Sequence, residues 1–160
     1  MRRSSGLTLA GLLVLVSLAA LLLGLLLPLG AYSDRHEKLQ VCRAHLKVLH
    51  QAQADPRAAT DSPPLGAAYW MRLAAPPLSL VEPGTLRCPL MDADRPCDYR
   101  GPARAPGGLS PQAAIGSDDN VNHDPHGRMG GNVLRKSGDV VTVPADGDYW
   151  QTTVRDETRF

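Results

Sequence analysis

The sequence predicts an α+β protein in which one long N-terminal helix packs on a small antiparallel β-sheet. An uncharged run of Leu, Val and Ala lies near the start of the chain. An amphipathic helical pattern follows it directly, and a β-hairpin pattern lies near the C-terminus. We therefore expect a helix with a membrane-spanning half and an amphipathic half, followed by a loop-rich β domain.

Length and composition limit the size and type of the domain that follows the apolar run. The chain has 160 residues, which allows one membrane segment and one small domain. Its 15 Gly, 14 Pro and 4% aromatic residues predict many loops and a thin core. The net charge of +1 gives no reason to expect a nucleic-acid partner.

The apolar run extends from Leu7 to Leu27, and we assign residues 7–31 to a transmembrane helix. Such a helix is about 30 Å long, enough to cross a bilayer core. Arg2 and Arg3 precede it, which predicts a single pass of the inner membrane with the N-terminus inside and a periplasmic or extracellular domain. A cleaved signal ending near Ala31 is the alternative, but this run exceeds the usual apolar length of a signal peptide. Both interpretations export the rest of the chain.

Residues 32–54 continue as an amphipathic helix. Its apolar stripe steps by three or four residues, with Val48 widening it, through Leu39, Cys42, Leu46, Leu49 and Gln53. Asp55-Pro56 ends the helix. His45 and His50 lie five residues apart, so they do not share a helix face, and we expect both to be exposed.

Residues 55–160 form the predicted small extracytoplasmic β domain. A short helix is expected at 67–75, where Tyr69, Trp70 and Leu73 supply apolar bulk before Pro76-Pro77 ends it. Later, strands at 132–136 and 139–143 flank Ser137-Gly138, the pattern of a hairpin with a two-residue turn. That turn predicts Lys136 opposite Asp139 and Leu134 opposite Val141.

Three cysteines occur, at positions 42, 88 and 97. An exported domain can hold disulfides, and an odd number leaves one cysteine over. Cys88–Cys97 would close a short loop, whereas Cys42–Cys88 would join the helix to the domain, and three reduced thiols are the third possibility. The spacing of Cys88 and Cys97 is not that of a zinc site.

A polar loop at 117–126 is the one candidate metal site. It places several oxygen ligands in a short span, and these are the donors that Ca²⁺ prefers: Asp118, Asp119, Asn120, Asn122 and Asp124. The spacing does not match the EF-hand, and Asp- and Asn-rich loops commonly form turns only. His123 and His126 with a carboxylate are an alternative transition-metal set. No cofactor other than this possible calcium ion is expected, and no catalytic motif occurs, so we expect a protein that is not an enzyme.

The N-terminal residues resemble the leader of type IV prepilins and type II secretion pseudopilins. Arg2-Arg3-Ser4-Ser5-Gly6 precedes Leu7-Thr8-Leu9 as a basic leader ending in Gly precedes the apolar helix in that family. The resemblance implies that a prepilin peptidase removes residues 1–6 by cutting between Gly6 and Leu7, followed by methylation of Leu7. Pro28 is the twenty-second residue from Leu7, where the family carries a proline that kinks the helix. Gly11 departs from the family, which normally has Glu at this fifth position for pairing with a neighbouring subunit.

Further stretches are similar to pilin-like proteins of the planctomycete type. These are Val41 to Lys47, Arg87-Cys88-Pro89, and a C-terminal region with His126, Gly131 to Leu134 and Gly138, in which Ser137 replaces the usual Asp. The resemblance implies that Cys42 and Cys88 are the usual cysteine pair. It also adds support for the calcium loop, because major pseudopilins of type II secretion bind calcium near the C-terminus.

The combined expectation is a non-enzymatic, pilin-like or pseudopilin-like subunit of a type IV pilus or a type II secretion-like fibre. Its implied partners are the membrane, other such subunits through the N-terminal helix, and the prepilin peptidase. Gly11 favours a minor subunit. The alternatives are a membrane-anchored binding module that does not polymerise, and a secreted metal-dependent enzyme that uses the 117–126 loop.

Overall fold

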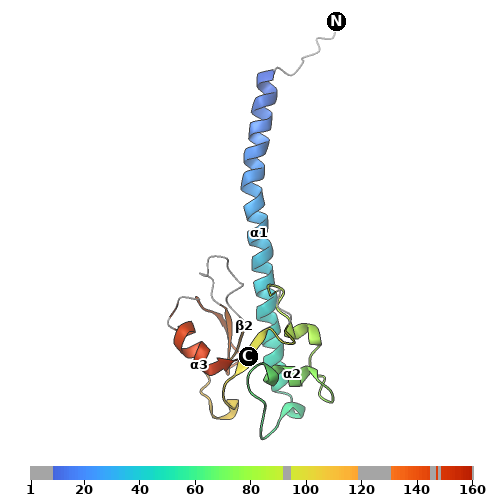
Figure 1. Ribbon diagram of the computed structural model, residues 1–160, viewed down its shortest axis with the longest axis vertical. Coiled ribbons are helices and arrows are strands. Elements are labelled where there is room, and N and C mark those ends of the chain that lie inside the picture. Colours follow the sequence, from blue (N-terminus) through green and yellow to red (C-terminus); the bar gives the residue numbers. More distant parts are fainter. Residues whose placement is uncertain (1–8, 92–94, 119–130, 145–146, 148, 160) are drawn as a thin grey trace. The chain divides into compact units, whose positions relative to one another are not determined.

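The computed structural model describes residues 9–91, 95–118, 131–144, 147 and 149–159 (Figure 1). The chain divides into two compact units, residues 1–36 and residues 37–160. Helix α1 (Leu9–Gln53) contributes to both units.

The first unit contains the apolar part of α1. The window Leu9–Leu26 has a mean hydropathy of 2.8, and none of it is buried. In the part of the chain that the structure describes, α1 is the one helix long and apolar enough to cross a membrane. Pro28 lies within α1, and the bend expected there stays a prediction.

The second unit is built on a five-stranded antiparallel sheet in the order β4-β3-β2-β1-β5. The strands are β1 (Tyr99–Pro102), β2 (Ala114–Asp118), β3 (Asn132–Arg135), β4 (Val140–Thr142) and β5 (Thr158–Arg159). Every residue of the central strand β2 is buried. The predicted α+β class with a small antiparallel sheet is thus confirmed.

Each face of the sheet has its own apolar cluster, because successive side chains of a strand point to opposite faces. Ile115 and Leu134 belong to the main core, together with residues of α1 and α2 (Ala67–Ala74). Ala114 and Val133 belong to a smaller cluster with Trp150 and Val154 from the π-helical turn η5 (Tyr149–Val154). The short helix α3 (Arg155–Glu157) leads from η5 into β5 (Figure 1). In the connections that the structure describes lie the short 3₁₀ helices η1 (Pro56–Ala58), η2 (Pro83–Leu86) and η3 (Pro106–Gly108).

The amphipathic part of α1 supplies one wall of the main core. Leu39, Cys42, Leu46 and Leu49 are all buried, as the helical period predicts. Val48 is 41% exposed, so the predicted widening of the stripe is wrong. Gln53 is half-buried, and its Oε1 accepts a hydrogen bond of 2.9 Å from the Tyr69 hydroxyl.

Helix α2 confirms the short helix predicted at this place. Tyr69, Trp70 and Leu73 are buried in the main core. The Trp70 indole nitrogen donates to the carbonyl oxygen of Arg100 in β1 at 2.9 Å, which satisfies the one polar atom of that side chain. The helix therefore fills space next to the sheet where the chain offers few other large side chains.

The hairpin formed by β3 and β4 exists, but the predicted register is wrong by one residue. Val133 pairs with Val141, and Leu134 pairs with Val140. The cause is a three-residue loop, because Arg135 N donates to Asp139 O and Gly138 N donates to Arg135 O, both at 2.9 Å. Gly138 has φ +94°, the left-handed conformation that closes such a loop with a bulge.

Candidate functional site

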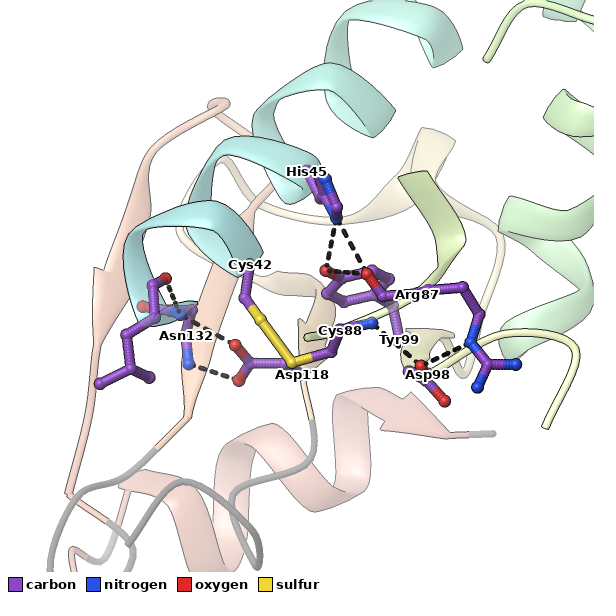
Figure 2. Close-up of a disulfide and its surroundings, with 9 residues drawn as sticks. Cys42, His45, Arg87, Cys88, Asp98, Tyr99, Asp118 and Asn132 are labelled. Carbon is purple, nitrogen blue, oxygen red and sulfur yellow. Dashed lines mark hydrogen bonds and ion pairs between the residues drawn. A yellow bond between two sulfur atoms is a disulfide. The ribbon is translucent and has the colours of Figure 1, made fainter. Parts of the chain in front are cut away.

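A disulfide joins α1 to the chain that follows η2 (Figure 2). Cys42 and Cys88 form it with a Cα–Cα distance of 5.5 Å, and both are buried in the main core. Cys97 remains a free cysteine, buried, with its Sγ 3.4 Å from the carbonyl oxygen of Tyr99. The pairing implied by the family resemblance is thus the one present, and the short-loop alternative Cys88–Cys97 is not.

A buried carboxylate supports the Cys88 side of the disulfide. Asp98 Oδ2 accepts a hydrogen bond from Cys88 N at 2.9 Å and forms an ion pair with Arg87 Nε at 3.1 Å. Asp98 N also donates to Leu86 O at 2.9 Å. These contacts hold the segment of Cys88 alongside the segment that enters β1, so the disulfide has a fixed support (Figure 2).

His45 makes the next contact along α1. Its Nδ1 lies 3.0 Å from the carbonyl oxygen of Arg87 and 3.1 Å from the Tyr99 hydroxyl. A carbonyl oxygen can only accept, so Nδ1 carries the hydrogen and donates it to Arg87, and the Tyr99 hydroxyl is left to donate to the same oxygen at 3.4 Å. Burial raises the pKa of Tyr99, and the negative charges of Asp118 and Asp98 raise it further, so the hydroxyl stays protonated. The expected exposure of His45 is wrong, because the ring is half-buried.

Further side chains tie α1 to the β3–β4 hairpin. Arg43 donates from Nη2 to Val140 O at 2.8 Å, and His50 Nε2 lies 3.3 Å from Lys136 O. His50 is also half-buried, so its expected exposure is wrong as well. Asn132 in β3 donates from Nδ2 to Leu39 O at 3.3 Å.

Asp118 holds Asn132 in position for that contact. Its Oδ1 accepts from Asn132 N at 2.6 Å, and its Oδ2 accepts from Asn132 Nδ2 at 2.8 Å (Figure 2). Both residues are buried. We call the set that ties α1 to the domain the helix–sheet junction; it comprises Arg43, His45, His50, Asn132 and the Cys42–Cys88 disulfide.

The chemistry of the helix–sheet junction is that of attachment. Burial raises the pKa of the Cys97 thiol to about 11, so near neutral pH it is protonated and a poor nucleophile. The polar groups of the junction are directed to backbone carbonyls or to one another rather than to a shared open space. The arrangement therefore ties the helix to the segment after η2 by one covalent bond and to the β3–β4 hairpin by several hydrogen bonds.

The other predicted site residues have different outcomes. Gly6, Leu7, Asp119, Asn120, Asn122 and Asp124 lie outside the described residues. Asp118 is described, and both of its carboxylate oxygens contact Asn132. Within the described ranges, no group of three or more His, Cys, Asp or Glu side chains could hold a metal ion. Calcium binding by the loop stays a prediction.

Sequence reasoning missed several members and supports of the junction. Three of them join segments that are far apart in the chain, namely Arg43 with Val140, Tyr99 with His45 and Asn132 with Leu39. Asp98 contacts Cys88, ten residues away. Local period and spacing carry no signal for such pairs. The cysteines were recognised as candidate disulfide partners because an odd number of them in an exported domain raises the question of which two pair.

Comparison of the chain with known protein families, with curated proteins and with solved structures found no match. Two features stand out, namely the exposed apolar segment of α1 and the disulfide that attaches the same helix to the segment after η2.

Proposed function

We propose that this protein is a non-enzymatic, pilin-like or pseudopilin-like subunit of a cell-envelope fibre, and a minor one. The N-terminal helix resides in the inner membrane before assembly, with the N-terminus inside and the domain outside. During assembly it leaves the bilayer and packs against the helices of other subunits. The domain is carried on the outside of the fibre.

The main support for this proposal is the division of α1 into an exposed apolar segment and a packed amphipathic segment. Helix α1 has an apolar segment, Leu9–Leu26, of which nothing is buried, and a later segment whose apolar stripe is buried against a sheet. An apolar surface of that length needs either lipid or other apolar helices around it. A subunit that moves from membrane to fibre meets both environments in turn.

The disulfide supports export of the domain. Disulfides persist in oxidising compartments and are rare in the cytosol. Cys42 and Cys88 both follow the apolar segment in the chain, so they would reach such a compartment if Arg2 and Arg3 keep the N-terminus inside. The attachment also suits a fibre subunit, because the helix must hold its domain during extraction from the bilayer.

Assembly of this kind derives its energy from packing and from the machine that extracts the subunit. Lipid tails are about as apolar as leucine, so leaving the bilayer yields little hydrophobic gain by itself. Gly11 stands where the family carries a glutamate for pairing with the subunit above. A subunit at the tip of a fibre has no neighbour above it, and for this reason we favour a minor subunit.

A membrane-anchored module that never polymerises is the second candidate. The absence of any carboxylate from Leu9 to Ser33 favours it, because the pairing used in ordinary polymerisation is then impossible. The two candidates differ in the fate of residues 1–6. A subunit loses them, whereas an anchor keeps them.

Mass spectrometry of the N-terminus separates these candidates. The full chain is produced together with a prepilin peptidase, purified from membranes and compared with chain produced alone. We expect a mature N-terminus at methylated Leu7 when the peptidase is present. Replacement Gly6→Val should block cleavage, since the peptidase reads a small residue there, whereas the neighbouring Ser5→Ala should not.

Each other result has a definite meaning. An intact Met1 in the presence of active peptidase would exclude the subunit and support the anchor. A chain beginning near Tyr32 would instead show a cleaved secretion signal. If the Gly6→Val variant is cleaved as efficiently as the unchanged chain, the resemblance of the N-terminus to a prepilin leader no longer supports the proposed function.

A further inference from the structure

The Cys42–Cys88 disulfide closes a loop of the chain that contributes to the main core. The two cysteines are 46 residues apart in the sequence. Helix α2 lies inside this loop, and its Tyr69, Trp70 and Leu73 are buried in the main core. The bond therefore restrains both α1 and the segment that carries α2.

The disulfide shifts the folding equilibrium far more than a hydrogen bond beside it does. Cross-linking residues at this separation favours the folded state by about a thousandfold, because the unfolded chain loses entropy. The hydrogen bond from His45 to the carbonyl oxygen of Arg87 is worth about two- to twelvefold by comparison. Loss of the disulfide is therefore not made good by such a contact.

The stability of residues 37–160 is expected to be low enough for this difference to decide folding. Small domains have folding equilibrium constants of about 10³–10⁸. This domain belongs near the lower end of that range, since a chain with 14 Pro and 4% aromatic residues forms a thin core. A thousandfold loss then leaves folded and unfolded domain in comparable amounts.

Both sulfur atoms are shielded from reductants in the folded domain. Cys42 is 0% exposed and Cys88 is 2% exposed. A thiolate reduces a disulfide by attacking one of its sulfur atoms directly, so its rate depends on access to that atom. Reduction of the folded domain therefore requires the domain to open first, and the bond is protected by the fold that it stabilises.

We propose that Cys42 and Cys88 form a redox-dependent folding switch for residues 37–160. With both thiols reduced, as in the cytosol, a large part of the domain population is unfolded, and oxidation after export shifts it to the folded state. In that step the two thiols give two electrons and two protons to an incoming disulfide compound, which leaves as two thiols. The inference rests on the export that the proposed function requires, but on neither cleavage after Gly6 nor fibre assembly, so its failure leaves the N-terminal test unaffected.

Reduction of the unchanged chain tests the switch without any substitution. The full chain in detergent micelles is unfolded in urea, reduced with dithiothreitol and returned to buffer, and part of it is then treated with oxidised glutathione. Trp70 and Trp150 are buried in the second unit, so their fluorescence reports folding. We expect a large unfolded fraction in the reduced chain without urea, and recovery of the folded fluorescence after oxidation.

Cysteine variants assign the effect to this pair. Cys42→Ala combined with Cys88→Ala should resemble the reduced chain even under oxidising conditions, with a folding equilibrium constant about a thousandfold lower. Cys97→Ala is the matched control, because it removes a buried cysteine outside the bond. This control should stay folded when oxidised and should still unfold in large part on reduction.

The rate of reduction tests the shielding of the sulfur atoms. Dithiothreitol is added to the folded, oxidised chain at several urea concentrations below the unfolding midpoint, and the two released thiols are counted by alkylation and mass spectrometry. Because opening must precede attack, the rate should rise steeply with urea.

Three results would overturn the proposal. A reduced chain with the fluorescence and urea midpoint of the oxidised chain would mean that the domain folds without the bond. An unfolded chain that oxidised glutathione does not restore would mean that another step controls folding. A reduction rate unchanged by urea would mean that the sulfur atoms are accessible in the folded domain.

Discussion

At the scale of single residues, Cys97 shows how burial decides chemistry. The same side chain on the surface would be a reactive thiol in an exported protein. Here it is buried beside β1, and its pKa is raised to about 11 by loss of hydration. The Cys42–Cys88 disulfide is thereby protected from attack by the one cysteine left over.

We expect the folded chain to show almost no reactive thiol near neutral pH and one thiol per chain after unfolding in urea. The rate of alkylation by iodoacetamide in the folded chain should rise with pH toward a midpoint near 11, compared with about 8.5 for an ordinary thiol. Mass spectrometry locates the label. Rapid labelling of folded chain at neutral pH would show that Cys97 is not buried.

The same shift predicts a pH effect on stability. Between about pH 9 and pH 11 the thiol ionises in the unfolded chain but not in the folded one, so ionisation favours unfolding. The free energy of unfolding should therefore fall as pH rises through this range, by about 2–3 kcal/mol from this group. Urea unfolding at pH 8 and pH 10 should show about half of this fall, roughly 1.4 kcal/mol, and Cys97→Ser should reduce it.

At the scale of elements, the disulfide is expected to be the largest single contribution to the attachment of α1 to the rest of the second unit. It links residues 46 apart, and the loss of chain entropy on closing a loop of that length corresponds to about 4 kcal/mol. The double replacement Cys42→Ser with Cys88→Ser should lower the free energy of unfolding by that order, whereas Cys97→Ser should cost much less. Trp70 and Trp150 both lie in the second unit, so tryptophan fluorescence in urea reports its unfolding. Equal midpoints for the two variants would contradict the expectation.

The turn between β3 and β4 makes a second prediction at this scale. Gly138→Ala should destabilise the protein by about 1–3 kcal/mol, because alanine resists φ +94°. In addition, a Cβ there would lie 2.7 Å from Cε1 of His50. The pair Gly138→Ala and His50→Ala forms a double-mutant cycle that separates the two causes. If His50→Ala restores nothing, the cost belongs to the backbone alone.

Features that depend on residues close together in the chain were predictable from the sequence, whereas features that depend on distant segments were not. The buried stripe Leu39–Leu49 and the helix that ends before Pro76 follow from local period and local stereochemistry, and both were predictable. The hairpin register was not, because it depends on whether Gly138 closes a two-residue or a three-residue loop. The cysteine pairing was left open by spacing alone. The bonds of Arg43 and Asn132 at the junction depend on how distant segments meet, which no local pattern encodes.

At the scale of the whole molecule, the two units differ in how they place their apolar side chains. Residues 37–160 bury their apolar side chains internally, whereas Leu9–Leu26 leaves all of its own exposed. A helix of this hydropathy is long enough to span a bilayer. The first unit therefore holds the part of the described chain that is apolar enough to cross a membrane.

Replacing both Leu15 and Leu18 by Arg should release the protein from membranes. Each arginine at the centre of a span costs about 2.5–3.5 kcal/mol on the insertion scale. The fraction of chain retained in the membrane pellet after an alkaline wash measures the loss. As a matched control, Val41 and Val48 are exposed residues of α1 in the second unit, and their replacement by Arg should leave retention unchanged. Equal retention of both variants would show that Leu9–Leu26 is not the anchor.

The position of the disulfide has a mechanical consequence. Tension that enters the second unit along α1 reaches Cys42 and passes through the sulfur–sulfur bond to Cys88, so the chain between them carries no load. The 45 residues between the two cysteines, about 160 Å when fully extended, include all of α2 and cannot extend under force while the bond is intact. Under a force applied to its N-terminus, the protein with the Cys42–Cys88 disulfide should therefore extend far less than the protein with both cysteines reduced. The disulfide thus limits the extension of the domain under force.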